Sequence, residues 1–199
     1  MKRVRGRPRQ YHPDQALDAA MHVFWAKGLT GTSLDDLCDA MGMNRPSIYN
    51  AFGDKQTIYR RALARFAGQL DLALGALLGG GADVRADLKR FFAGALDVYY
   101  AAEPAHGCLV MCTAPVEALA HPEVGDDLRG VIARIDRALT RRLRAAQAAG
   151  GLAPDIDCLQ AARTLQALLH SAALRARAGE PRRALEGFIR FGCRAVLGG

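Results

Sequence analysis

The side chains between residues 44 and 52 have types and spacing that suit contact with duplex DNA. At about 100° per residue on a helix, Ile48 and Phe52 share one face, which we expect to be buried. The outward side then carries Pro46, Ser47 and Asn50, with Arg45 and Tyr49 along one flank. Donors and acceptors in the middle of such a face can meet base edges, while hydroxyl and cationic groups at its margins contact phosphates. This pattern predicts a helix that enters a DNA groove.

A second segment with candidate chemistry runs from His106 to Cys112 and reads His-Gly-Cys-Leu-Val-Met-Cys. Cys108 lies near the start of a predicted helix with His106 close by, an environment that can lower a thiol pKa and make the sulfur reactive. A buried, unreactive cysteine is the alternative. Cys108 and Cys112 lie one helical turn apart, where a disulfide would strain the backbone. A metal would need further ligands that the sequence does not supply, so we expect no metal and no other cofactor.

Two short helices joined by a glycine turn would position residues 44–52. Ser33 and Asp36 form the Ser-x-x-Asp pattern of a capping box, and Gly42 ends the helix that they begin. Asn44 is a suitable N-cap for the second helix, and Pro46 falls in its first turn, where the missing N–H costs nothing. This arrangement predicts a helix-turn-helix, whose second helix is free to contact base edges.

The rest of the chain is also predicted to be helical. Alanine and leucine dominate while valine, isoleucine and threonine are sparse, which favours helices over strands. Apolar periodicity and Gly or Pro breaks place the other helices at 14–28, 55–78, 84–102, 107–120, 123–149, 156–178 and 182–197. We therefore expect an all-α protein of about nine helices, with a three-helix DNA-binding domain followed by a helical bundle.

Composition excludes several classes of protein. With 199 residues, 50% of them hydrophobic and 24% charged, the chain can bury a substantial core. No window approaches the roughly 18 to 20 apolar residues of a membrane span, and no secretory signal is recognisable, so we expect a cytoplasmic location. The five cysteines are an odd number with no C-x-x-C pair, which favours reduced thiols.

Positive charge is concentrated at the front of the chain. Residues 1–65 hold 11 Lys and Arg against 6 Asp and Glu, or +5 of the total net charge of +7. Five of these cations lie within residues 1–9, which contain no acidic residue, namely Lys2, Arg3, Arg5, Arg7 and Arg9. We expect residues 1–9 to be a flexible basic arm that contacts the minor groove or flanking phosphates.

The first sixty residues resemble a known family. The matching positions are Phe24-x-x-Lys27-Gly28-x-x-x-Thr32-Ser33-Leu34-x-x-Leu37, then Gly42-Met43 through Ser47-Ile48-Tyr49-x-x-Phe52-x-x-Lys55-x-x-Ile58-Tyr59. Over roughly residues 10–60 this pattern is similar to the DNA-binding domain of TetR/AcrR transcriptional regulators. The resemblance implies a homodimer of nine-helix subunits, a small-molecule pocket in the C-terminal domain, and release from operator DNA when the effector binds.

The resemblance also assigns roles by position. It implies a phosphate contact at Thr32 or Ser33 and contacts to the DNA backbone from Tyr49 and Lys55. Lys55 has independent support, because the N-terminus of its helix already favours a phosphate. Ser33 is explained by helix capping as well. The base-side candidates are Arg45, Pro46, Ser47 and Asn50.

The segment from Gly107 to Val110 is similar to one in family members that sense electrophiles and oxidants. This similarity makes Cys108 and Cys112 a candidate sensor. Further along, apolar stripes on the last two predicted helices suit a dimer interface, with ordinary intrachain core as the alternative.

These observations predict a basic arm at 1–9, a DNA-binding domain at 10–55 and a ligand-binding and dimerisation domain at 56–199. The predicted function is a ligand-responsive repressor that is released from a palindromic operator by an unknown small molecule. Activation in place of repression is a variant, and an architectural DNA-binding protein without an effector is an alternative. A small helical enzyme is the weakest alternative, because the sequence shows no nucleophile-base set or phosphate-binding loop.

Overall fold

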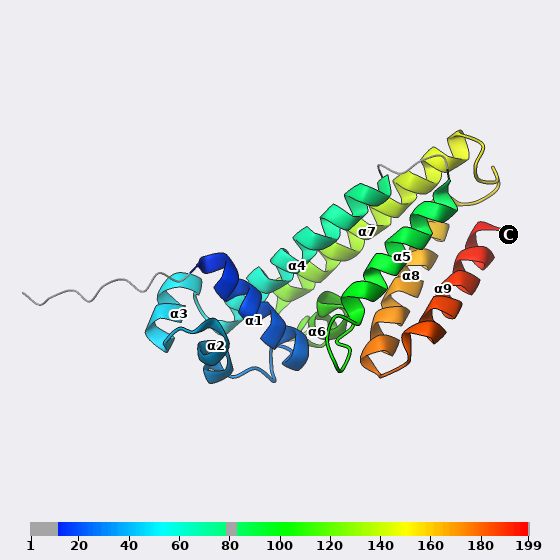
Figure 1. Cartoon of the computed structure of the whole chain (residues 1–199). Helices are drawn as coiled ribbons and strands as arrows, with labels where there is room; N and C mark the ends of the chain where they lie inside the picture. Colours follow the sequence, from blue (N-terminus) through cyan, green and yellow to red (C-terminus); the bar gives the residue numbers. More distant parts are fainter. Residues whose placement is uncertain (1–11, 79–82, 199) are drawn as a thin grey trace, which may run out of the picture. The chain divides into compact units, whose positions relative to one another are not determined.

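The computed structural model describes residues 12–78 and 83–198, and within these ranges the chain forms helices and no strand (Figure 1). The helices are α1 (Pro13–Lys27), α2 (Leu34–Met41), α3 (Arg45–Phe52), α4 (Lys55–Leu78), α5 (Val84–Tyr99), α6 (Leu109–Glu117), α7 (Pro122–Ala148), α8 (Cys158–Arg177) and α9 (Arg182–Leu197). The prediction of an all-α protein of about nine helices is confirmed. The predicted basic arm at 1–9 lies outside the described residues.

The chain divides into two compact units between Ala62 and Leu63, whereas the sequence placed the division between residues 55 and 56. The first two turns of α4 belong to the first unit because their apolar side chains complete its core. Ile58 and Tyr59 are fully buried, and the Tyr59 ring meets the edge of Phe24 with 5.2 Å between ring centroids. The second unit contains the rest of α4 and α5 to α9.

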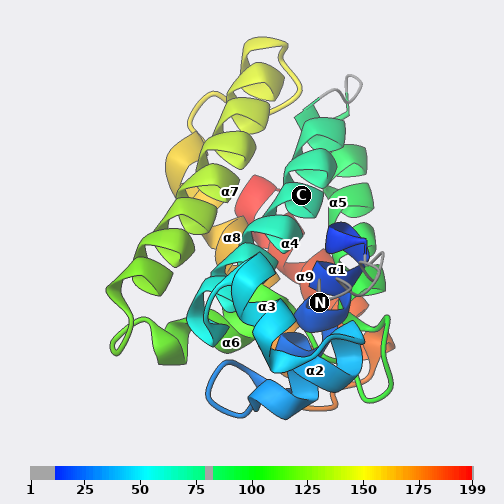
Figure 2. The ribbon, with the colours of Figure 1, turned by 90° about the vertical axis from the view of Figure 1, so that its left-hand side faces the viewer.

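Local hydrogen bonds explain the helix boundaries of the first unit, which Figure 2 views from the side of α1, α2 and α3. The Ser33 hydroxyl accepts from the Asp36 N–H at 3.0 Å, and the Asp36 carboxylate accepts from the Ser33 N–H at 2.9 Å. Gly42 ends α2 in the left-handed region, with φ of 63°. Because this conformation is costly for other residues, glycine allows the tight turn into α3.

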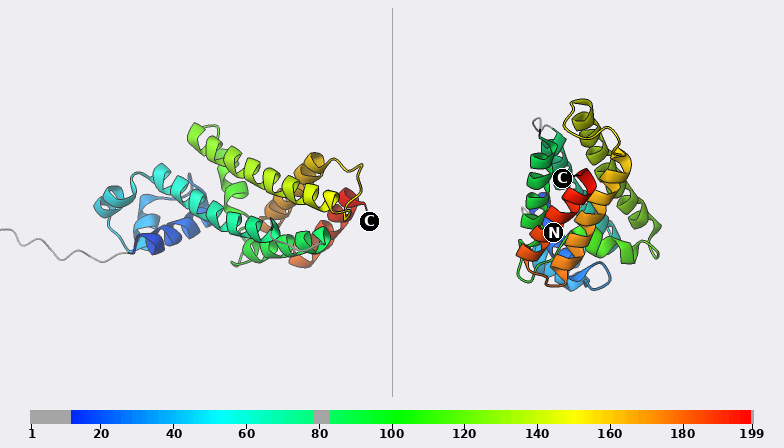
Figure 3. Two further views of the ribbon diagram at one scale, coloured as in Figure 1. Left: turned by 90° about the horizontal axis from the view of Figure 1, so that it is seen from above. Right: turned by 90° about the vertical axis from the view of Figure 1, so that its right-hand side faces the viewer.

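The second unit is a helical bundle in which α8 packs against both α7 and α9, and the right-hand view of Figure 3 shows α8 and α9 side by side. Gly192 allows this close approach, since a Cβ there would lie 2.4 Å from Leu168 Cδ1. Much of the predicted interface stripe is intrachain core, including Leu165, Leu169 and Leu185. Two apolar residues that were not part of that stripe are exposed, Leu174 on α8 and Phe191 on α9.

A buried ion pair joins α5 to α7. The Arg142 guanidinium donates to the Asp87 carboxylate, with Nε to Oδ2 at 2.7 Å and Nη2 to Oδ2 at 2.6 Å. Both side chains are almost fully buried, and Arg90 also contacts Asp87 from the surface. Burying either charge without its partner would be unfavourable, so the pair fixes how these helices face each other.

Among the described helices, none is long and apolar enough to cross a membrane. The same residues contain no cluster of three or more His, Cys, Asp or Glu side chains arranged to hold a metal ion.

Candidate nucleic-acid interface

Helix α3 has one buried face and one exposed face. Ile48 and Phe52 are at most 2% exposed and form part of the core of the first unit. The remaining predicted contact residues of α3 all reach the surface: Arg45, Pro46, Tyr49 and Asn50 are exposed and Ser47 is half-buried. The structure thus brings all five sequence-predicted residues of this helix onto one accessible surface.

The start of α3 is held by its own cap. The Asn44 side-chain oxygen accepts from the Ser47 N–H at 2.9 Å, and Pro46 lies in the first turn. Met43, just before the cap, is buried. This local arrangement fixes the helix end that carries Arg45, Pro46 and Ser47.

Arg45 is paired with an acidic residue that the sequence analysis did not assign. Its Nη2 donates to both Asp35 oxygens at 2.8 Å, and its Nε donates to Oδ1 at 3.1 Å. These hydrogen bonds raise the pKa of Arg45, and both side chains are more than half exposed. The adjacent acids Asp35 and Asp36 on the preceding helix were the available signal for this pair.

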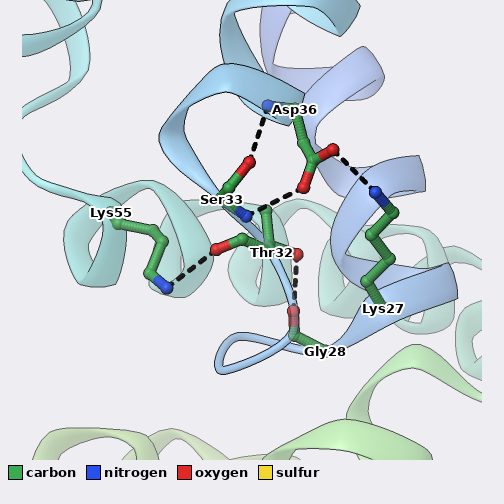
Figure 4. A network of polar contacts seen from close by, with 6 residues as sticks. All are labelled: Lys27, Gly28, Thr32, Ser33, Asp36 and Lys55. Atoms are coloured by element: carbon green, nitrogen blue, oxygen red, sulfur yellow. Dashed lines mark hydrogen bonds and ion pairs between the residues drawn. The ribbon is translucent and has the colours of Figure 1, made fainter.

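Lys55 holds the loop between α1 and α2 (Figure 4). Its ammonium donates to the Leu29 carbonyl at 3.0 Å and to the Thr32 carbonyl at 2.8 Å. An ammonium has three hydrogens, so one remains for a phosphate. Lys55 therefore combines a structural role with the capacity for the predicted contact.

Thr32 and Ser33 differ in what they can offer to DNA. The Thr32 side chain is buried, and its hydroxyl donates to the Gly28 carbonyl at 2.6 Å. Ser33 is exposed, and its hydroxyl accepts from the Asp36 N–H, which leaves the hydroxyl hydrogen free to be donated. Of the two, Ser33 is the one whose side chain can donate to a phosphate.

Asp36 joins this network to α1. Lys27 Nζ lies 2.6 Å from Asp36 Oδ1, as Figure 4 shows. The hydrogen bond from Lys27, with those from Ser33, lowers the pKa of Asp36 to about 2. The Asp36 carboxylate of the capping box is therefore ionised at neutral pH, and its ion pair with Lys27 links α2 to the end of α1.

The N-terminus of α4 is already capped. Asp54 Oδ1 accepts from the Thr57 N–H at 2.7 Å, and hydrogen bonds from Thr57 lower the pKa of Asp54. The carboxylate occupies one of the N–H groups that we expected to attract a phosphate. Any phosphate contact at this end must use Lys55 and the remaining N–H groups.

In the second unit, Cys108 is the N-cap residue of α6 and is buried. Burial raises the pKa of the Cys108 thiol to about 12 and also raises the pKa of Cys112. The Cys112 thiol, half-buried, donates to the Ala173 carbonyl at 3.7 Å. The structure places both predicted sensor residues at the start of α6, Cys108 as its N-cap and Cys112 in its first turn, in surroundings that favour the protonated thiols.

Cys108 lines a cavity of about 90 Å³ inside the second unit. The walls come from α4 to α8 and are mostly apolar, with Phe66, Phe91, Val131 and Leu169 among them. His170 also lines the cavity, and its Nε2 is buried without a hydrogen-bond partner. No pattern in the sequence points to this histidine, because only the packing of α8 against the other helices turns it inward.

Comparisons with known proteins agree in both units. Residues 16–62 match the family described as bacterial regulatory proteins, tetR family, and residues 85–191 match the tetracyclin repressor-like C-terminal domain. The transcriptional repressor ComR of Escherichia coli is 28% identical over 180 residues, which cover 90% of this chain and 86% of ComR. The repressor BdcR of the same organism is 40% identical over 76 residues, covering 38% of this chain and 39% of BdcR.

Solved structures extend the likeness over the whole fold. A cysteine mutant of the TetR-family regulator CifR, complexed with 26-bp operator DNA, has a TM-score of 0.86 and 32% identity, covering 95% of this chain and 99% of that one. Reduced Escherichia coli NemR has a TM-score of 0.79 at 19% identity over 93% of this chain and 96% of its own, a likeness of fold alone. With matching N-terminal and C-terminal regions and the exposed face of α3, this chain belongs to the TetR family of bacterial regulatory proteins.

Proposed function

We propose that this protein is a transcriptional repressor that binds a palindromic operator as a homodimer and leaves it when a small molecule binds. The observation that carries the proposal is the division of α3, with Ile48 and Phe52 buried beneath an exposed polar and cationic face. The relative CifR has been solved on operator DNA. In a dimer each α3 would enter a major groove, with half-site centres about 34 Å apart.

The proposed contacts follow from exposure and from free donors. The proposed phosphate contacts come from Tyr49, Lys55 and Ser33. Thr32 instead positions the loop between α1 and α2 through its buried hydroxyl. The base-side candidates are Arg45, Pro46, Ser47 and Asn50. To contact a base edge, Arg45 must break its hydrogen bonds to Asp35 and bind the DNA instead. Operator recognition therefore includes the breaking of an exposed ion pair.

The exposed apolar residues Leu174 and Phe191 support a dimer interface on α8 and α9. In a symmetric dimer the same patch is contributed by both subunits. The proposed repressor acts in the cytoplasm, where its operator DNA lies. We assign it no catalytic activity.

The cavity beside Cys108 is the proposed effector site. Its volume of about 90 Å³ is small. An engineered cavity of about 150 Å³ admits benzene, so this one suits a molecule of fewer heavy atoms unless its walls move. The walls carry no buried cation that would pair with an anion, and His170 offers one hydrogen-bonding nitrogen. The effector should be small and uncharged, with a single polar group.

A covalent trigger at Cys108 is the second candidate, and the position of Cys108 on the cavity wall favours it. The thiol pKa of about 12 opposes it, because the thiolate is the reacting species. Iodoacetamide labelling at pH 7.5 distinguishes a covalent trigger at Cys108 from an effector that binds reversibly in the cavity. We expect Cys108 to label far more slowly than a cysteine of the unfolded chain, and equal rates would support the covalent trigger.

Helix α4 is the expected lever between effector and DNA, since it contributes Tyr59 to the core of the first unit and Phe66 to the cavity wall. The effector would favour a conformation in which the two α3 helices of the dimer are no longer spaced to enter successive major grooves. Such a preference is typically about 1 to 3 kcal/mol. Butan-1-ol suits the cavity as an uncharged probe, with butyrate as its charged control. Release of the operator by the alcohol alone would support an uncharged effector.

Selection of bound sequences from a random DNA pool tests the main proposal. We expect a palindrome to emerge, and we expect Asn50→Ala to change its sequence. Arg137→Ala, which removes an exposed arginine on α7, is the matched control and should select the same palindrome. Uniform binding to all sequences would favour the architectural alternative.

A further inference from the structure

A second and larger cavity of about 500 Å³ lies in the second unit between α5 and α9. Its apolar walls include Leu88, Phe92 and Leu96 from α5 and Ile189 and Leu197 from α9. It shares no lining residue with the cavity beside Cys108, because the two open on different faces of α5. Its volume falls in the range of about 300 to 1,000 Å³ that is usual for small-molecule sites.

This larger cavity is an open groove, and α5 and α9 run in opposite directions along it. At one end Arg85 Nη2 donates to the Leu197 carbonyl at 3.2 Å, and at the other Arg182 Nη2 lies 2.7 Å from Asp97 Oδ1. Figure 1 shows α5 beginning where α9 ends. Lys89, one turn along α5 from Arg85, is therefore level with the last turns of α9, where Arg194 lies.

The charges around the groove do not balance. The lining includes four cations and one acid, Glu186, which is already paired with Arg182 at 3.1 Å. Arg85 is engaged with main-chain carbonyls at the end of α9. The other three cations, Lys89, Arg190 and Arg194, are exposed and have no acidic partner among residues 12–78 and 83–198. Three unpaired positive charges thus border an apolar groove.

We propose that this groove binds a small amphipathic anion, an apolar chain that ends in a carboxylate. The chain would lie against Phe92, Leu96 and Ile189, where its contact with water is removed. The carboxylate would lie between Lys89, Arg190 and Arg194, which supply charge-assisted hydrogen bonds. A neutral ligand would leave these cations unused, and a second copy of the chain would have to bury three unpaired charges.

Titration calorimetry with dodecanoate, kept below its micellar concentration and without DNA, tests this proposal. We expect saturable binding of one dodecanoate per chain. Lys89→Ala combined with Arg194→Ala should weaken it at least tenfold, and Ala93→Trp, which fills the groove, should abolish it. Arg183→Ala is the matched control, because Arg183 is an exposed arginine of α9 outside the groove. Unfolding temperatures of all variants establish that they fold.

The ligand series separates a specific site from surfactant behaviour. Dodecan-1-ol and dodecyltrimethylammonium should bind at least tenfold more weakly than dodecanoate. Equal binding of all three compounds would overturn the proposal, as would dodecanoate binding that both groove variants leave unchanged. Sedimentation in which the groove variants alter self-association but not dodecanoate binding would assign this face to a second copy instead. Because no DNA is present, these outcomes leave the repressor proposal untouched.

Discussion

The guanidinium of Arg45 on α3 holds the carboxylate of Asp35 on α2 through both oxygens, with 2.8 Å from Nη2 to each. The pair joins the two helices of the helix-turn-helix and keeps Arg45, the one cation of α3, occupied. Because solvent screens an exposed pair of this kind, it adds little to stability, and DNA can replace Asp35 at small cost.

Asp35→Asn should therefore strengthen operator binding about two- to tenfold at low salt, since it frees Arg45 and removes a negative charge near DNA. Fluorescence anisotropy with labelled operator over a salt series measures the effect. Arg45→Ala should weaken binding in either background. If Asp35→Asn binds equally well with and without Arg45, then Arg45 does not contact the DNA.

Lys55→Ala should lower both stability and operator affinity. Removing its ammonium leaves the Leu29 and Thr32 carbonyls without their donor, and hydrogen bonds to charged groups contribute about 1.5 to 3 kcal/mol. Urea unfolding should show a loss in that range, and affinity should fall about tenfold for all DNA sequences. Lys27→Ala is the control, because solvent screens its ion pair with Asp36 and its loss should lower stability much less than the loss of Lys55. An unchanged midpoint for Lys55→Ala would contradict the role in the loop.

Asp87→Ala should strongly destabilise the second unit. It would break the buried ion pair with Arg142, and breaking a buried pair from one side costs about 3 to 5 kcal/mol. Asp126→Ala removes a carboxylate from the exposed pair with Arg129 and should change the free energy of unfolding by less than about 1 kcal/mol. Equal effects of the two substitutions in urea unfolding would show that the buried pair contributes no more to stability than the exposed one.

Gly107→Ala should destabilise the second unit by about 2 kcal/mol or more. Gly107 has φ of +66°, and a Cβ there would lie 2.3 Å from the Ala173 carbonyl oxygen. Gly68→Ala in α4 is the matched control, since a Cβ at that position meets nothing within 4 Å. Thermal unfolding should show a gain of about 0.5 to 1 kcal/mol for the control, because alanine favours the helix interior.

His170 should make the second unit less stable as the pH falls. Burial lowers the pKa of His170, and the nearby Asp136 offsets this only in part. The unfolded chain, with a histidine pKa of about 6.5, then binds the proton more readily than the folded chain. The stability that depends on neutral His170 is present above about pH 6.5 and is lost as the pH falls through the folded pKa.

The measurement is the free energy of unfolding from pH 7.5 to 5 for the wild-type protein and for His170→Gln. The variant should lose less stability over this range, since glutamine does not titrate. If the free energy of unfolding falls in parallel for the two proteins, His170 is protonated equally in the folded and unfolded states.

The amino-acid sequence by itself determined the helix-turn-helix. The Ser33 and Asp36 capping box, the Gly42 turn and the Asn44 cap all act within about four residues, and the structure has each of them as predicted. The burial of Ile48 and Phe52 followed from helical periodicity alone. Interactions between near neighbours can be inferred from spacing, because the local backbone geometry is known in advance.

Tertiary structure decided how those residues are used. Lys55 meets carbonyls 26 and 23 residues away, and Arg45 meets a carboxylate on another helix, so neither partner follows from local spacing. The same holds for Cys108: its place at a helix start left a reactive thiol and a buried, unreactive one both open, and burial under other helices raises its pKa to about 12. A side chain's partners and its loss of hydration depend on which helices pack together, and only the folded chain fixes that.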